Sequence, residues 1–161
     1  MRKIDLSRLR VGNGVGSDYV RTELTTSDVI RSLCTFSEEH FRGILTVNVI
    51  NNDSGIVTVC ADGLAFFLKM LLCRVFGRTE VTATVNCGRR ELHVTLDLGG
   101  TSIDTEGLFE IAEHSGFQAE LIEDCVIKIT TAVKRTSALA IYAADREVFL
   151  RALYAAFFMN N

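Results

Sequence analysis

The sequence contains no proline, although proline makes up about 5% of an average protein. The chain therefore lacks the residue that fixes rigid turns and stiff linkers, and its composition indicates no Pro-rich connection between two domains. We expect turns to be built by the 12 glycines and by clusters of Asn and Asp. With 161 residues and 48% hydrophobic content, the chain is long enough for one domain that buries about 70% of its unfolded surface.

Neither a strong charge of one sign nor a long apolar run is present. The net charge is −3 with acidic and basic residues interspersed, which predicts no nucleic-acid surface and no membrane-attracting face. The longest apolar stretches, Ala138–Ala144 and Ala152–Met159, are too short to span a bilayer. The sequence does not combine a cationic start, an apolar core and a small-residue cleavage site, the three features of a secretory signal peptide. These absences predict a cytoplasmic protein without nucleic acid or membrane among its partners.

The five cysteines show no paired spacing. Their odd number and scattered positions argue against a disulfide framework and favour a reducing compartment. No Cys-x-x-Cys pair is present and the three histidines are far apart in the sequence, so we expect no metal site. Most of these thiols are expected to be small buried side chains. The cysteines are Cys34, Cys60, Cys73, Cys87 and Cys125.

The N-terminal part is glycine-rich and weakly patterned. Residues Gly12–Ser17 read Gly-Asn-Gly-Val-Gly-Ser, but they lack the lysine and the hydroxyl residue of a phosphate loop. No apolar strand precedes them either. We therefore expect residues 1–22 to form a flexible arm and residues 23–161 to form a single domain.

Hydrophobic spacing predicts the first helix and the strands that follow it. Apolar residues recur at helical spacing after Thr26 or Ser27, either of which can cap a helix, and Gly43 is a natural stop. Alternating residues then predict strands at Ile44–Ile50 and Ile56–Cys60. The Asn-rich turn between these strands predicts a hairpin.

The later segments repeat the pattern of a helix followed by a hairpin. Asp62 can cap a helix that is apolar almost all round and should therefore lie centrally. The predicted elements are a helix at Gly63–Phe76, strands at Thr79–Cys87 and Glu91–Leu98, a helix at Thr105–Ser115, strands at Gln118–Ile122 and Cys125–Val133, an added strand at Ser137–Ala143, and a final helix capped by Asp145. This order predicts an α+β two-layer sandwich, with a mixed, mainly antiparallel sheet and helices on one face.

Two stretches between Leu64 and Val133 resemble known sequence boxes. They are Phe67–Val75, on the second predicted helix, and Val94–Ile103, which reads Val-Thr-Leu-Asp-Leu-Gly-Gly-Thr-Ser-Ile. Their order and the helix and hairpin that follow resemble the ATP-binding domain shared by sensor histidine kinases, DNA gyrase, MutL and the ninety-kilodalton heat-shock chaperones. The resemblance implies a histidine kinase-like ATPase fold, with a nucleotide site at these two boxes.

The helix box lacks the side chains that the family uses. There, two asparagines four residues apart point at the phosphates, and a side-chain oxygen helps to hold magnesium. The resemblance places Met70 and Arg74 at these positions. A thioether is a poor ligand for a hard cation, and a guanidinium has no acceptor for one. Arg74 can instead touch a phosphate directly, or pack its stem on the protein while its head reaches solvent.

The strand box resembles apolar-x-apolar-x-Asp-x-Gly-x-Gly-Ile. Strand alternation places the apolar residues of Val94–Leu98 on one face, so the family's adenine-reading aspartate corresponds to Leu98. Gly100 matches the first glycine and Ser102 replaces the second. Asp97 would serve as the acid only if the strand were bulged by one residue.

The long mobile lid of the family is also missing. Only four residues separate Ile103 from Leu108, and Gly107 is the remnant of the third glycine box. Phosphoryl transfer depends on positioning and charge clamps, so a site without lid, metal ligand and adenine acceptor is expected to be degenerate. The candidate nucleotide-binding residues are Met70, Arg74, Asp97, Gly99, Gly100, Ser102 and Gly107, and none is a candidate catalytic residue.

Competing functions remain open from the sequence. The first is a non-catalytic, pseudokinase-like domain of bacterial-type signalling that acts in protein–protein interaction or regulation without a cofactor. The second is an atypical ATP-binding protein or kinase that uses ATP and magnesium at a reduced site. A third is an unrelated small-molecule enzyme that uses Cys73 or another thiol, for which the sequence positions no base.

The C-terminal helix suggests how a protein partner or a second copy would bind. Its apolar residues are expected to form an exposed patch suited to dimerisation. These residues are Phe149, Leu153, Phe157 and Phe158.

Overall fold

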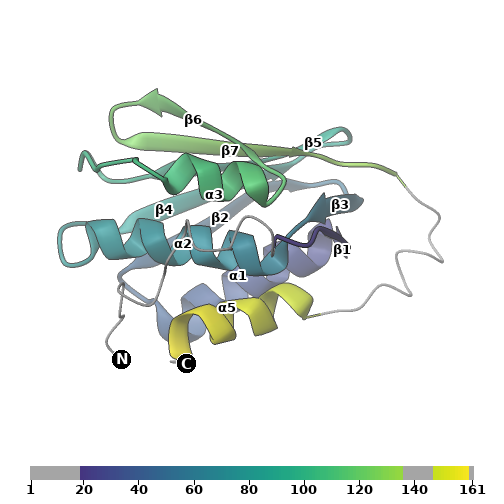
Figure 1. Cartoon of the computed structure of the whole chain (residues 1–161), viewed down its shortest axis with the longest axis horizontal. Coiled ribbons are helices and arrows are strands. Elements are labelled where there is room, and N and C mark those ends of the chain that lie inside the picture. Colours follow the sequence, from purple (N-terminus) through teal and green to yellow (C-terminus); the bar gives the residue numbers. More distant parts are fainter. Residues whose placement is uncertain (1–18, 136–146, 160–161) are drawn as a thin grey trace.

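The computed structural model describes residues 19–135 and 147–159. One layer is a mixed sheet of five strands in the order β2-β4-β5-β7-β6, and the helices form the other layer (Figure 1). The predicted α+β sandwich is confirmed, as is the hairpin of β6 and β7. The elements are β1 (Thr22–Thr25), α1 (Thr26–His40), β2 (Leu45–Asn52), β3 (Ile56–Val59), α2 (Ala61–Val75), β4 (Val81–Cys87), β5 (Glu91–Asp97), α3 (Leu108–His114), β6 (Gln118–Glu123), β7 (Val126–Ala132) and α5 (Val148–Phe158).

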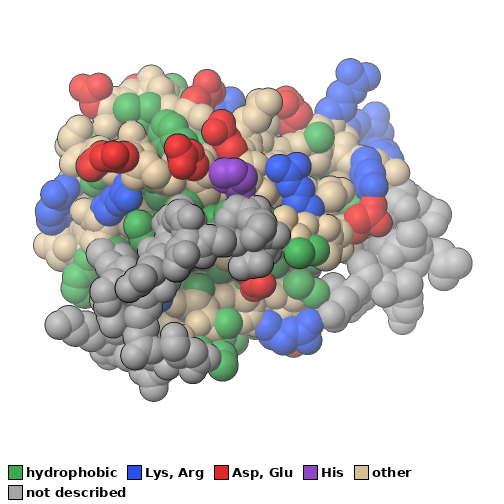
Figure 2. Space-filling view, viewed as in Figure 1, with side chains coloured by type: hydrophobic (Ala, Val, Ile, Leu, Met, Phe, Trp, Pro, Cys, Tyr) green, Lys and Arg blue, Asp and Glu red, His purple; other side chains and the backbone are tan. Residues whose placement is uncertain are grey.

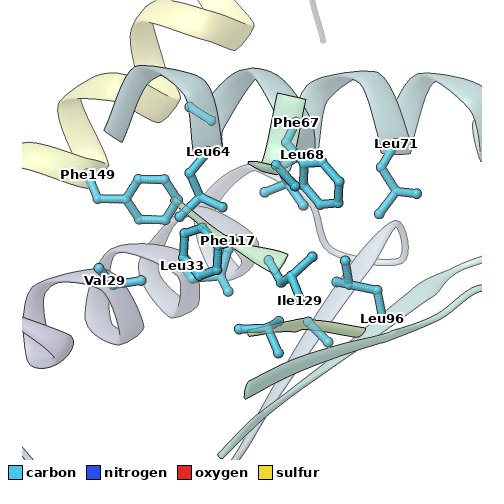
Figure 3. Packing of buried hydrophobic residues seen from close by; sticks show 14 of the residues in the cluster. Val29, Leu33, Leu64, Phe67, Leu68, Leu71, Leu96, Phe117, Ile129 and Phe149 are labelled. Atoms are coloured by element: carbon cyan, nitrogen blue, oxygen red, sulfur yellow. The ribbon is translucent and has the colours of Figure 1, made fainter. Parts of the chain in front are cut away.

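A continuous apolar core joins the helices to the sheet. Helix α2 runs across the middle of the sheet, with α3 on one side and α1 and α5 on the other (Figure 1). Leu64 of α2 lies near Phe149 of α5 and Leu33 of α1, while Leu96 and Ile129 meet them from the sheet (Figure 3). Each such side chain contributes about 1.5–3 kcal/mol when fully buried. The core therefore includes the C-terminal helix.

The predicted hairpin between residues 44 and 60 is wrong. Strand β2 pairs in parallel with β4, whereas β3 pairs antiparallel with β1. The Asp53 N–H donates to the Cys87 carbonyl at 2.8 Å, so the pairing with β4 continues to the end of β2 and the chain leaves β4 only after it. At Gly55 a Cβ would lie 2.4 Å from Val133 Cγ1, which shows how closely the chain turns against β7. Parallel pairing needs a long crossover, and β3 with α2 provides it.

The caps of two helices lie one or two residues before their predicted positions. The Thr25 hydroxyl accepts a backbone N–H and caps α1, where Thr26 or Ser27 was expected. The Cys60 thiol caps α2 in the same way, so Asp62 lies inside the first turn. Both caps satisfy N–H groups that the helix itself leaves unbonded.

Three predictions fall on residues outside the described ranges. They concern most of the N-terminal arm (residues 1–18), the added strand at Ser137–Ala143 and the cap at Asp145. Among the described residues, no helix combines the length and apolarity needed to cross a membrane.

The described end of the predicted arm belongs to the folded domain. Tyr19 stacks on His114 with ring centroids 5.3 Å apart, and Arg21 donates to the Glu113 carbonyl at 3.0 Å. Thr22 is the first residue of β1. Tyr19 and Arg21 therefore contact the domain, whereas the division of the chain at residue 22 stays a prediction.

The apolar residues of α5 are buried inside the chain itself. Phe149, Leu153 and Phe157 are at most 2% exposed, and the rings of Phe157 and Phe36 in α1 lie 5.1 Å apart. The predicted exposed patch is wrong for these three residues, because they complete the core over α1 and α2. Phe158 remains half-buried.

Asp28 anchors the start of α5 to α1. Its carboxylate is fully buried and accepts hydrogen bonds from the backbone N–H groups of Glu147 and Phe149, the latter at 3.2 Å. The Ser32 hydroxyl donates to it at 3.4 Å and the Arg31 guanidinium lies 3.8 Å away. A carboxylate at a helix N-terminus also meets the positive end of the helix dipole. This one side chain therefore couples the two ends of the domain.

The surface carries both signs of charge, interspersed on the face shown in Figure 2. Few large apolar side chains are exposed among the described residues. Val49 and Ile50 lie on β2, and Leu121 and Ile122 lie on β6. These two strands are the opposite edges of the sheet.

We expect Asp28→Ala to lower the free energy of unfolding by about 3 kcal/mol, because it leaves two N–H groups of α5 unbonded and removes a charge beside the helix dipole. Asp28→Asn keeps one acceptor and should lose less. Chemical denaturation followed by circular dichroism measures both. The control is Asp62→Ala, an exposed acid in the first turn of α2. Equal losses at the two positions would contradict this role for Asp28.

Candidate functional site

The end of β5 has the alternation that the sequence predicts. The strand pairs without interruption with β4 and with β7, so no bulge shifts its last residues. Leu98 is fully buried and Asp97 is exposed. The Asp97 carboxylate accepts a hydrogen bond from the Gly99 N–H at 2.9 Å, so this side chain is directed toward the backbone of the turn that follows β5. A leucine therefore lies in the core at the position to which the resemblance assigns the adenine-reading acid.

The two glycines after β5 build a tight turn. The Thr101 N–H donates to the Leu98 carbonyl at 3.0 Å, and Gly99 and Gly100 have φ of +62° and +82°. Positive φ at both central residues is the type I′ geometry, which glycine adopts at little cost. A Cβ at Gly99 would also lie 2.1 Å from Thr79 Oγ1. Backbone geometry and the contact with Thr79 account for these glycines without a phosphate.

Arg74 is bound by the loop that follows this turn. Its guanidinium donates to the carbonyls of Asp104 and Glu106 at 2.5 and 2.9 Å. Arg78 lies four residues further and donates to the Ser102 carbonyl at 3.1 Å. The sequence offered two alternatives for Arg74, a phosphate contact or a head in solvent, and the structure shows a third, in which the head binds protein carbonyls.

Arg78 is a residue of this cluster that the sequence analysis missed. Its spacing of four residues from Arg74 is the one signal that could have found it, because residues four apart lie on the same side of a helix. The helix itself ends at Val75, however, and Gly77 has φ of +78°. The shared direction of the two arginines therefore depends on the turn after the helix, which has no such regular pattern.

The loop between β5 and α3 is short and bonded to itself. The Asp104 carboxylate accepts the Glu106 N–H at 2.9 Å, and the Leu108 N–H donates to the Thr105 carbonyl at 3.0 Å. Gly107 precedes α3 with φ of +76° and provides no side-chain cap. Helix α3 thus begins at Leu108 and not at the predicted Thr105. The side chain of Ser102 is exposed.

Met70 contributes an apolar surface to the site. It is half-buried and packs against the core, on the helix that also packs on α3. Its neighbour Lys69 is only 4% exposed. Within the described ranges, no three His, Cys, Asp or Glu side chains gather in a way that could hold a metal ion.

In four of the five cysteines, burial opposes formation of a reactive thiolate. All five cysteines are free. Burial raises the pKa of Cys34, Cys60, Cys73 and Cys87 above the ordinary value of a thiol, and at Cys73 the charge of Lys69 only partly opposes this. A raised pKa lowers the fraction of reactive thiolate at neutral pH. This direction is opposite to what a thiol enzyme needs.

Comparison with sequences and with structures gives different results. No protein-family model matches the chain, and no curated protein matches it. Solved structures do match. The cytoplasmic segment of histidine kinase QseC has a TM-score of 0.50 and 12% identity, covering 84% of this chain and 99% of that segment. The nucleotide-free catalytic domain of histidine kinase ThkA has a TM-score of 0.50 and 17% identity, covering 72% and 99%.

A third match is histidine kinase ThkA in complex with the response regulator TrrA. Its TM-score is 0.53 at 17% identity, over 80% of this chain and 48% of the kinase. Identities this low show the fold and leave activity open. On the strand order, the helix layer and these matches, the chain has the histidine kinase-like ATPase fold.

Proposed function

We propose that this chain is a non-catalytic domain of the histidine kinase-like fold, which acts by contact with proteins and not by turnover of ATP. The observation that carries the proposal is the hydrogen bonding of Arg74. Its guanidinium is held by two backbone carbonyls of the loop between β5 and α3. In the resembling family this helix position carries an asparagine whose oxygen serves magnesium. Here the guanidinium of Arg74 occupies this position and binds the loop between β5 and α3.

Two further features support the loss of nucleotide chemistry. Leu98 provides no acceptor for an adenine amino group, and a hydrogen bond to a charged group is worth about 1.5–3 kcal/mol. The loop between β5 and α3 is too short to form a lid that excludes water. Phosphoryl transfer needs positioned phosphates and charge clamps, and these residues supply neither.

The role in protein contact is supported by a solved structure in which a protein of this fold is bound to another protein. The ThkA structure cited above contains a response regulator bound to a kinase of this fold. From that structure we infer for this chain only that a domain of this fold can act within a protein complex. A cytoplasmic signalling role, which the sequence predicts, belongs to the same proposal.

The alternative is an atypical ATP-binding protein or kinase that uses ATP and magnesium. It requires Arg74 to leave the carbonyls of Asp104 and Glu106 and to turn toward a phosphate. The binding of a phosphate to a guanidinium is strong enough to compete with neutral carbonyls, because both partners are charged. The alternative is therefore distinguishable by the two measurements that follow.

Titration calorimetry with magnesium and ATP at millimolar nucleotide should give no saturable heat. The reason is that Leu98 offers no acceptor for adenine, Met70 and Arg74 offer no oxygen ligand for magnesium, and the guanidinium of Arg74 is already bound. A saturable heat that disappears in Arg74→Ala would establish the alternative in place of this proposal. The control for specificity is Arg89→Ala, an exposed arginine in the turn between β4 and β5.

Arg74→Ala should lower the free energy of unfolding by about 1–2 kcal/mol, since it removes two charge-assisted hydrogen bonds from a partly exposed group. Exchange of the Glu106 and Leu108 amides should become faster, because the loop loses its attachment to α2. Arg74→Lys should not restore either property, as one ammonium cannot replace the fork of a guanidinium. Hydrogen exchange read by mass spectrometry measures the loop. Unchanged exchange in Arg74→Ala would show that the loop does not need this contact.

A further inference from the structure

Three polar side chains contact one another on the face of the sheet that is turned away from the core. Glu91 and His93 lie two residues apart on β5, so both side chains project from this face. Thr130 of β7 is the register partner of His93. The Nδ1 atom of His93 lies 3.1 Å from the Thr130 hydroxyl oxygen, and its Nε2 atom lies 3.5 Å from a carboxylate oxygen of Glu91. A hydroxyl, an imidazole and a carboxylate therefore form a chain of contacts.

The carboxylate favours one tautomer of the imidazole. An ionised carboxylate accepts hydrogen bonds and cannot donate them, so the ring proton is favoured on Nε2, the nitrogen that faces Glu91. Nδ1 then keeps its lone pair and accepts the hydrogen of the Thr130 hydroxyl. A hydroxyl bound to a base that a third group orients has the arrangement of an activated nucleophile.

A groove beside Thr130 has room for a small molecule. Its volume is about 410 Å³, and Glu91 and Thr130 are both part of its lining. Ala132 also lines it, two residues further along β7 and opposite Glu91. A methyl group at this position leaves the space next to the Thr130 side chain open. Pockets for small ligands measure about 300–1,000 Å³, so the groove is large enough to bring a reactant to this hydroxyl.

Two sources of N–H donors line the same groove. Gln118 of β6 is the register partner of Thr130 and is exposed, and its side-chain amide carries two N–H groups. The Val133 N–H donates to the Arg90 carbonyl at 2.7 Å, so the peptide groups of Ala132 are directed away from β5. Such donors stabilise the negative oxygen that develops when a hydroxyl attacks a carbonyl carbon.

We propose that Thr130 is an acylation site, whose hydroxyl takes an acyl group from a small activated ester or thioester. The Thr130 oxygen forms a bond to the acyl carbon, and the bond between that carbon and its leaving group breaks. His93 accepts the hydroxyl proton at Nδ1 and passes it to the departing alcohol or thiol. Glu91 is a positioning residue, because it acts through His93. The product is an ester on Thr130, formed once per chain.

This site is separate from the loop that Arg74 binds. Glu91 begins β5, whereas that loop follows the end of the same strand. The transfer needs neither ATP nor magnesium and consumes its own hydroxyl. It therefore goes beyond the proposed function and is compatible with a domain that turns nothing over.

Acetylation by p-nitrophenyl acetate tests the proposal on the native protein. Peptide mass spectrometry should find an acetyl group on Thr130 that hydroxylamine removes, since an ester is cleaved and an acetylated lysine is not. Thr84 is the internal control, because it is half-buried on the same face of the sheet and its register partners are Asn48 and Thr95. Thr130→Val has nearly the same shape without the hydroxyl and should lose the label.

Variants of the other two residues test their roles. His93→Ala should slow the acetylation of Thr130 at least about a hundredfold, because a general base contributes about 10²–10⁴-fold. Glu91→Ala should slow it less, and Glu91→Gln should recover most of the rate, since its amide oxygen accepts the same ring hydrogen. Circular dichroism verifies that each variant is folded.

The proposal fails if Thr130 stays unlabelled, or if Thr84 is acetylated as fast as Thr130. It also fails if His93→Ala reacts at the native rate, since the hydroxyl would then need no base. A further result would overturn the single transfer. Release of nitrophenolate that continues beyond one equivalent per chain, and that Thr130→Val abolishes, would show hydrolysis in its place.

Discussion

The uninterrupted pairing of β5 between β4 and β7 determines which side chains the end of this strand directs inward. Because both ladders run without a bulge, the side chains of β5 alternate strictly, and Leu98 after it is buried while Asp97 is exposed. A shift by one residue would reverse every side chain of the strand, placing polar groups in the core and apolar groups in water. The sheet therefore cannot present Asp97 inward without breaking its own packing. The register of the sheet therefore determines that Leu98, and not Asp97, occupies the core position.

The arginines at the end of α2 complete this arrangement. With no acid at Leu98 and no oxygen ligand on the helix, the loop between β5 and α3 is held by Arg74 and Arg78 through three carbonyls. Carbonyl oxygens are neutral acceptors, so the loop supplies no carboxylate to these contacts. The two arginines thus connect the end of α2 to the loop between β5 and α3.

Local patterns predicted the elements better than their partners. Alternation identified β4, β5, β6 and β7, and it also placed Leu98 inside, because the period of a strand is a property of the strand alone. Pairing is not local, so β2 and β3 were joined as a hairpin although each pairs elsewhere. The bond from Glu147 to Asp28 spans 119 residues and has no signal in either segment. For the same reason the apolar face of α5 predicted burial but not whether the chain itself or a partner would bury it.

The burial of α5 also changes where a contact surface can lie. Helix α5 covers the outer side of α1 and α2, and its apolar residues are used within the domain. Four of the seven large apolar side chains that are exposed among the described residues lie on the edge strands β2 and β6, and the others are Val20, Phe76 and Met159. Both edges offer backbone groups, and the acids of β6 oppose pairing with a like strand while β2 has no such charge. Charge, more than apolar area, therefore distinguishes the two edges of the sheet.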